Sequence, residues 1–102
     1  MRIRYLEDAR LEIQDGSEYY CKVASPAMAK VFRRAVRDAV RMVRTHPLAW
    51  QKTEFFGRRY VMTRFPYSVI YEIDGDDLVV VAVACQYRDP YYWADRVASL
   101  RP

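Results

Sequence analysis

The sequence predicts an α+β domain with the element order β-α-α-β-β-β-α, in which a helical hairpin packs on a mainly antiparallel sheet. Two observations predict this class. Apolar residues recur with helical spacing in the first half of the chain, whereas strand-like alternation and a continuous apolar run mark the second half. The chain has 102 residues, 52% of them hydrophobic and 29% charged, which is enough for one buried core and too little for two. We therefore expect a single domain over residues 1–102.

The first half predicts a short strand and two helices. Apolar and polar residues alternate over residues 2–6, which is typical of a strand. A helix should follow from about Asp8, because apolar residues then recur at intervals of three and four as far as Ala24. Gly16 interrupts this helix, and the simplest explanation is close contact with a neighbouring helix.

The second helix should start at Ser25-Pro26, since serine caps helices and proline fits the first helical position. It should end near Thr45, before His46-Pro47. Its apolar stripe comprises Met28, Val31, Phe32, Ala35, Val36, Ala39, Val40 and Val43. Because the link between the two helices is so short, they should form an antiparallel hairpin.

The second half predicts three strands and a last helix. Residues 58–65 and 67–73 alternate as strands on either side of Pro66, and a hairpin turn is expected at residues 74–75. Residues 78–85 are continuously apolar, which indicates a central strand buried on both faces. A short helix should then begin at Asp89-Pro90, with one face formed by Trp93, Val97 and Leu100.

The charge balance favours an acidic partner. The 17 Lys and Arg residues exceed the 13 Asp and Glu residues by four, and all but three of the bases are arginine, which binds phosphate and carboxylate groups in a planar fork. The two cysteines and one histidine match no metal-ligand spacing, so we expect no metal or other cofactor. The longest apolar run is too short to span a membrane, and the first residues lack an apolar secretory segment, so we expect a cytoplasmic protein.

Bases cover the polar side of the second helix, where Asp38 is the only acid. They are Lys30, Arg33, Arg34, Arg37, Arg41 and Arg44. A solvated helix face is the simpler interpretation, and a surface for nucleic acid or for an acidic partner is the functional one. Spacing alone does not choose between them.

Other arginines lie on or after the predicted strands. Alternation places Arg58 and Arg64 on one face of their strand and Arg59 on the other, and Arg88 follows the central strand. Such arginines could hold phosphate or stabilise a developing negative charge. The structural alternative is ion pairing with Glu54, Glu72, Asp89 or Asp95.

Three tyrosines accompany Arg88, namely Tyr87, Tyr91 and Tyr92. Tyrosines beside arginines suit base stacking or proton transfer on RNA. Their structural alternative is a half-buried aromatic patch that supports Trp93.

Three segments of the second half carry a family resemblance: FPYSVIYEI at residues 65–73, LVVVAVA at 78–84 and RDPYYWADR at 88–96. Together they resemble the RelE/ParE superfamily of type II toxin–antitoxin toxins, and the resemblance extends less specifically over nearly the whole chain. It implies the same element order and a small basic toxin that a cognate antitoxin neutralises, so we expect a hetero-oligomer with that antitoxin and no membrane partner.

The resemblance implies one of two activities. RelE-like members cut mRNA on the ribosome without a metal, whereas ParE-like members inhibit DNA gyrase. Residues 60–63 here stand where cleaving members carry lysines, and Ser68 stands where they carry an arginine. Cys85 and Tyr87 replace a histidine and an arginine of related chains, which leaves Arg88 as the basic position that matches well.

We therefore expect a gyrase-binding toxin. The alternatives are a ribosome-dependent endoribonuclease and an inactivated toxin that retains antitoxin binding. If the chain cuts RNA, the catalytic candidates are Arg88, Arg64, Tyr91 and Tyr92. The candidates for target binding are Arg59, Arg88, Tyr87 and Arg96. The candidates for antitoxin binding are Arg33, Arg37, Arg41 and Arg44.

Overall fold

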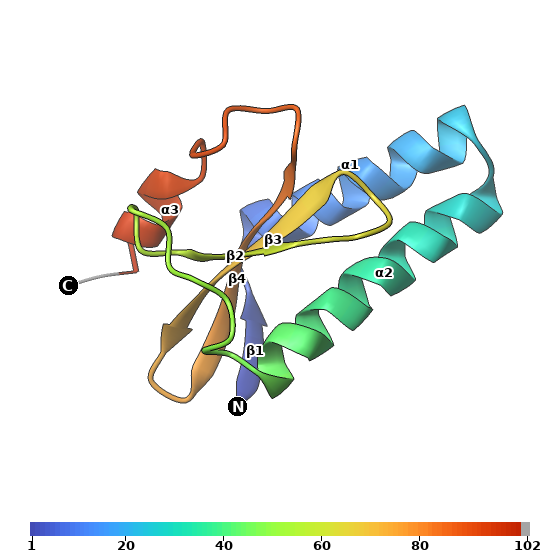
Figure 1. The fold of residues 1–102 in the computed structure, drawn as a ribbon. Coiled ribbons are helices and arrows are strands. Elements are labelled where there is room, and N and C mark those ends of the chain that lie inside the picture. The colour runs from blue at the N-terminus through green and yellow to red at the C-terminus, as the bar shows by residue number, and fades with distance from the viewer. Residues whose placement is uncertain (101–102) are drawn as a thin grey trace.

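The computed structural model describes residues 1–100, and within them four strands form one sheet with helices against both faces (Figure 1). In chain order the elements are β1 (Arg2–Tyr5), α1 (Glu7–Val23), α2 (Pro26–Thr45), β2 (Arg58–Val61), β3 (Tyr67–Asp74), β4 (Asp77–Cys85) and α3 (Ala94–Ala98). No helix among these residues is long and apolar enough to cross a membrane. The predicted α+β class and element order are confirmed.

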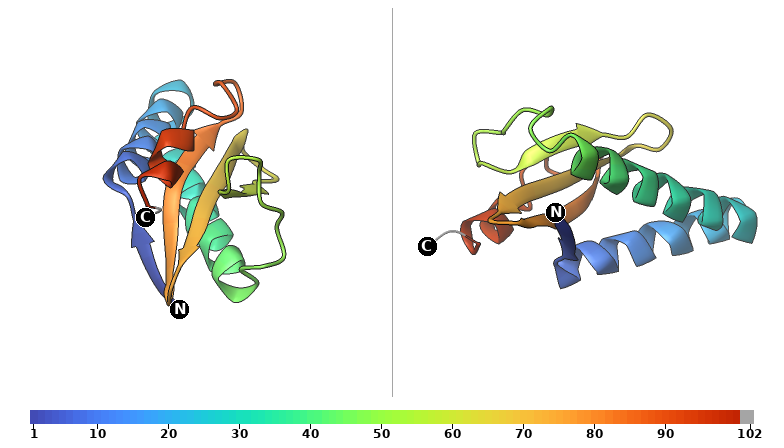
Figure 2. Two further views of the ribbon diagram at one scale, coloured as in Figure 1. Left: turned by 90° about the vertical axis from the view of Figure 1, so that its left-hand side faces the viewer. Right: turned by 90° about the horizontal axis from the view of Figure 1, so that it is seen from below.

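β4 lies at the centre of the fold. The strand order is β1-β4-β3-β2, with β1 parallel to β4 and the other pairs antiparallel. Every residue from Leu78 to Ala84 is buried, as predicted for a strand covered on both faces. α1 and α2 cover one face, and α3 covers part of the other. Figure 2 shows that the helical hairpin extends past the sheet at the link between α1 and α2.

A bulge in β4 changes which side chains face the hairpin. The register shifts between Ile70 and Tyr71 of β3, which leaves Val81 as the extra residue of β4. Val80 on one side of the bulge and Val83 on the other both join the core beneath the hairpin. Strict alternation would have placed them on opposite faces.

β1 is too short to pair with the whole of β4. It pairs with residues 77–80 only, so the later part of β4 has no strand on that side. Glu12 and Arg96 take the place of that strand. The Val83 N–H donates to Glu12 Oε1 at 3.1 Å, and Arg96 Nη1 donates to the Val81 carbonyl at 3.2 Å. Two side chains thus satisfy backbone groups that a longer β1 would have paired.

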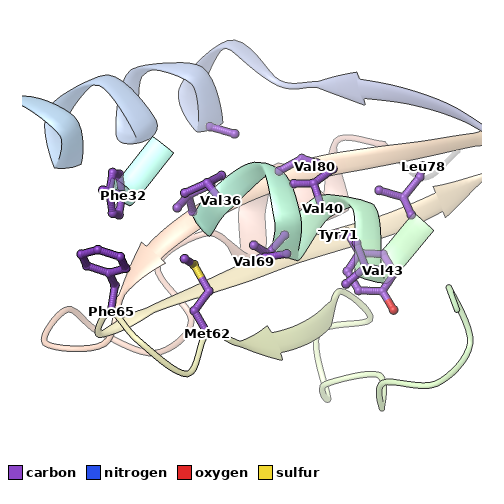
Figure 3. Packing of buried hydrophobic residues seen from close by; sticks show 13 residues of the cluster. Phe32, Val36, Val40, Val43, Met62, Phe65, Val69, Tyr71, Leu78 and Val80 are labelled. Carbon is purple, nitrogen blue, oxygen red and sulfur yellow. The ribbon is translucent and has the colours of Figure 1, made fainter. Parts of the chain in front are cut away.

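The hairpin packs as its sequence predicts. Ser25 caps α2 by accepting a hydrogen bond from the Met28 N–H at 3.0 Å. The buried side chains of α2 point at β3 and β4, as Figure 3 shows for Phe32, Val36, Val40 and Val43. A Cβ atom at Gly16 would lie 2.6 Å from the Phe32 ring, which confirms that α2 approaches α1 closely at this glycine.

The strand expected over residues 58–65 ends with β2 at Val61. The chain reverses between Met62 and Tyr67, where the Met62 N–H donates to the Tyr67 carbonyl at 2.9 Å and the Tyr67 N–H donates to the Phe65 carbonyl at 2.7 Å. Arg64 therefore lies in this turn, and its predicted place on a strand face is wrong.

The last helix begins later than Asp89-Pro90 predicts, because α3 starts at Ala94. The Asp89 carboxylate accepts from the Tyr91 N–H at 2.9 Å, and the Asp89 carbonyl accepts from the Tyr92 N–H at 3.3 Å. Asp89 thus caps a tight turn with hydrogen bonds spanning three residues, and this turn leads into the helix.

Candidate functional site

Arg88 belongs to a cluster of side chains at the end of β4. Its guanidinium stacks on the Tyr92 ring, with its central carbon 3.6 Å from the ring centroid. Arg88 Nη1 also lies 3.5 Å from Glu12 Oε2. The sequence predicted Arg88 and Tyr92 together, and the structure brings them into contact. Arg88 pairs with Glu12, however, and not with any of the four acids expected as its ion-pair partners.

Glu12 of α1 is the centre of this cluster. It accepts from both terminal nitrogens of Arg96 at 3.0 and 3.1 Å, from the Tyr92 hydroxyl at 2.6 Å and from the Val83 N–H. Its side chain is 12% exposed. The sequence analysis missed Glu12, although Ala9 and Gly16 gave a signal. Positions three residues before and four residues after Glu12 are both buried, so helical spacing puts this carboxylate on the packed face of α1.

The cluster changes the pKa of Tyr92. Burial raises the pKa of the Tyr92 hydroxyl, and its hydrogen bond to Glu12 acts in the same direction. Tyr92 therefore stays protonated, with its proton directed at a carboxylate. The guanidinium groups of Arg88 and Arg96 share the same carboxylate. Tyr92 is consequently no free base, and the charge of Arg88 is partly neutralised.

Arg59 lies on the α3 side of the sheet, opposite to Arg58 as alternation predicted, and two aromatic rings lie beside it. Its guanidinium lies 5.7 Å from the ring centroids of both Tyr91 and Trp93, and Nη2 donates to the Pro90 carbonyl at 2.6 Å. Arg58 faces the other way and donates to the Trp50 carbonyl at 2.6 Å. Tyr91 thus belongs to the group around Arg59 and not to the cluster around Glu12.

The predicted target-binding residues share one end of the molecule. Arg59 and Arg88 border a hollow of about 210 Å³ on the α3 side of the sheet. Tyr87 is 87% exposed. Arg96 is held by Glu12, with its side chain 20% exposed. Tyr87 and Arg88 are therefore exposed, Arg59 is half-buried, and Arg96 is held in the cluster.

The four catalytic candidates are not assembled. Arg88 and Tyr92 are in contact, but Tyr91 packs on Phe55 with ring centroids 4.8 Å apart. Arg64 borders a separate hollow beside α2, together with Asp38 of α2 and Tyr60 of β2. Among the described residues, Arg64 therefore does not join Arg88 and Tyr92 in one site, as the list of catalytic candidates requires.

An apolar groove of about 560 Å³ runs between α1 and the adjoining ends of β3 and β4. Several of its lining side chains are strongly exposed, including Tyr19 at 55%, Val23 at 58% and Tyr87. Glu12, Asp15 and Arg88 supply its charged groups. The groove combines aromatic surface with both signs of charge, which suits a polypeptide better than a polyphosphate.

Tyr67 in this groove gives a prediction for the pH dependence of stability. Burial raises the pKa of Tyr67 from its ordinary 10.0 to about 12. The unfolded chain loses this proton first, so the stability that Tyr67 contributes is complete below about pH 10 and is lost as the pH rises toward 12. The urea concentration at the midpoint of unfolding should therefore fall less steeply in Tyr67→Phe than in the unmodified chain as the pH rises. Urea unfolding between about pH 9 and pH 12 measures this difference.

Tyr87→Phe is the matched control, because this hydroxyl is exposed and folding changes its surroundings little. The prediction would be wrong if Tyr67→Phe and the control gave the same pH profile as the unmodified chain.

The predicted antitoxin-binding arginines lie along the exposed side of α2. Arg33 donates to the Ser17 hydroxyl of α1, and Arg41 lies 3.7 Å from Asp38 on its own helix. Arg37 and Arg44 form no ion pair within residues 1–100. The four arginines thus all lie on α2, and none of them belongs to the cluster around Glu12.

Comparison with known proteins identifies relatives over most of the chain. A family model described as ParE toxin of type II toxin–antitoxin system, parDE, matches residues 3–90. Among solved structures, the fold is similar to one described as a chromosomal ParDE TA system from P. aeruginosa, with a TM-score of 0.73 and 13% identity. That similarity covers 83% of this chain and 95% of the other. No curated protein matches the sequence.

Proposed function

Since the chain belongs to the ParE toxin family of type II toxin–antitoxin systems, we propose that it inhibits DNA gyrase by binding it and does not cleave RNA. The end of the molecule that displays Arg59, Arg88 and Tyr87 is the proposed contact with the target. Tyr87 is exposed and adjoins Arg88 in the sequence, and tyrosine and arginine side chains often form strong anchors in protein interfaces.

The Glu12 cluster is the observation that carries this proposal. Metal-independent cleavage of RNA needs positive charge at the phosphate and groups that move protons. Here Glu12 holds both Arg88 and the Tyr92 proton, and its carboxylate would repel a phosphate brought to the same place. Arg64 borders a different hollow. Arg88 and Tyr92 are thus bound to Glu12, and Arg64 lies away from both.

The antitoxin is proposed to dock in the apolar groove beside α1. An interface needs a desolvated apolar centre, and Tyr19, Val23 and Tyr67 supply it here. An amphipathic segment that folds on binding could place apolar side chains in the groove and ion-pair with Arg88 at its end. Antitoxin binding at this position would also cover Tyr87, which explains in physical terms how it could block the target surface.

Gyrase inhibition can be measured directly against RNA cleavage. The purified chain should inhibit DNA supercoiling by gyrase, while mRNA on translating ribosomes stays intact. Arg88→Ala should weaken the inhibition about tenfold or more, because it removes a charged anchor of the proposed contact. Lys52→Ala is the control, since it removes one exposed positive charge elsewhere and should change inhibition less than about twofold.

Two outcomes would overturn this proposal. Ribosome-dependent cleavage that Arg88→Ala abolishes would assign the chain to the RNA-cleaving branch. Antitoxin binding without any effect on supercoiling or on mRNA would show an inactivated toxin.

In cells, DNA synthesis should stop before protein synthesis after induction of the chain alone.

A further inference from the structure

The two helices of the hairpin carry opposite charge. α1 holds five acids and two bases, a net charge of −3, whereas α2 holds six bases and one acid, a net charge of +5. The rest of the chain outside α2 has eleven bases and twelve acids, a net charge of −1. The whole positive excess of the protein therefore resides on α2.

The bases of α2 form a single narrow stripe. At 3.6 residues per turn, the six side chains fall within an arc of about 100° and extend about 21 Å along the helix axis. Between Lys30 and Arg44 no other residue falls within this arc, and Asp38 lies just outside it. All six side chains are exposed. We call this surface the α2 stripe; its members are Lys30, Arg33, Arg34, Arg37, Arg41 and Arg44.

Most of the α2 stripe is without a counter-charge. Within residues 1–100, its ion pairing is limited to the long contact of Arg41 with Asp38, and none of the acids of α1 pairs with it. Arg33 donates to the Ser17 hydroxyl, which does not neutralise its charge. Like charges this close repel one another, so the stripe destabilises the free chain. A bound polyanion would reduce this repulsion.

The stripe has the chemistry of a phosphate-binding surface. Its centre has no exposed apolar side chain to anchor a protein interface, whereas the groove beside α1 has several. Five of its six members are arginine, which binds phosphate oxygens in pairs. Duplex DNA presents one negative charge per about 1.7 Å of its axis, so a duplex would offer phosphates along the full length of the stripe.

We infer that the α2 stripe binds the backbone of double-stranded DNA without sequence preference. This binding goes beyond the proposed inhibition of gyrase and does not depend on it, because it needs neither the enzyme nor the residues around Arg88. It would place the chain on the same polymer as any DNA-bound target and raise its local concentration there.

The test is the salt dependence of binding to a labelled duplex of about 20 base pairs, about three times the length of the stripe. Fluorescence anisotropy with the full chain should give micromolar affinity at about 50 mM salt. With four to six phosphate contacts, the slope of log K against log salt should be about −4 to −5. The double variant R34Q/R37Q should lower the affinity about tenfold or more and reduce the slope by about 2.

The matched control is K22Q/K52Q, which removes the same charge from outside the stripe and should change the affinity less than about twofold. Circular dichroism of each variant should show that the helices are retained, because glutamine is a good helix former on an exposed helix face.

Three results would overturn the inference: no binding at low salt, an equal loss in both double variants, or R34Q/R37Q weakening antitoxin binding while DNA binding is unchanged. The last result would assign the stripe to the acidic protein partner that the sequence predicts. Because anisotropy is measured without gyrase, failure here is distinguishable from failure of the supercoiling assay.

Discussion

Replacing Glu12 with alanine should lower the free energy of unfolding by about 3 kcal/mol. The change leaves the Val83 N–H, the Tyr92 hydroxyl and the Arg96 guanidinium without their shared acceptor at a site that is largely shielded from water. A loss of this size should lower the melting temperature by roughly 15 °C for a domain of about 100 residues. Urea unfolding followed by circular dichroism measures it.

Glu18→Ala is the control on the same helix. Glu18 is exposed and accepts one hydrogen bond from Gln14 at 3.1 Å, so its loss should cost about 0.5 kcal/mol or less. Glu12→Gln should fall between the two, because the amide keeps one oxygen as an acceptor but loses the charge. A Glu12→Ala variant as stable as Glu18→Ala would show that solvent replaces the cluster without loss.

Trp93→Ala should destabilise the protein by about 4 kcal/mol, because it empties the centre of the core on the α3 side. Trp93 is fully buried, and the absence of a side chain at Gly57 allows this close packing, since a Cβ there would lie 3.0 Å from the indole ring. Arg59 and Tyr91 lie around the same ring. The variant should therefore also loosen the proposed target surface, and urea unfolding gives its stability.

Trp93→Phe separates the volume of the ring from its polar group. Within residues 1–100, the indole Nε1 is buried and has no hydrogen-bond partner. Phenylalanine therefore loses some volume but no hydrogen bond, and the cost should be about 1 to 2 kcal/mol. Equal losses in Trp93→Phe and Trp93→Ala would contradict this account. Phe55 packs on Tyr91 and is partly exposed, so Phe55→Ala should lower the free energy of unfolding by less than about 1 kcal/mol.

Local signals in the sequence predicted most of the fold. Ser25-Pro26 specified the start of α2, and the continuous apolar run of β4 specified a strand buried on both faces. Gly16 indicated the close approach of two helices. Each of these features leaves a signal within a short stretch of sequence, either a capping or glycine residue or a run of apolar residues.

Three features of the fold were not predicted from the sequence patterns. The end of β2 depends on the reversal between Met62 and Tyr67, and the late start of α3 depends on the turn that Asp89 caps. The bulge at Val81 leaves no trace in a run of apolar residues, since every neighbour is equally hydrophobic.

The candidate site shows the same division. Arg88 and Tyr92 were found because they are neighbours in sequence, and Arg59 was placed correctly by strand alternation. Glu12 was missed because its partners lie more than 70 residues away, although its helical position beside buried residues was visible. Arg64 was misplaced because alternation was extended through the turn that ends β2.

The pairing of β1 with β4 also sets when the molecule can fold. These strands join residues 75 positions apart, from Arg2 to Asp77, and Glu12 meets Arg96 across 84 positions. Closing loops of that length costs entropy before any contact forms, and high contact order slows folding relative to a helical bundle. During synthesis, the apolar side of α2 therefore stays exposed to solvent until β3 and β4 have been synthesised. The cluster that holds Arg88 is completed last, so the proposed binding to a target requires that residue 96 has left the ribosome.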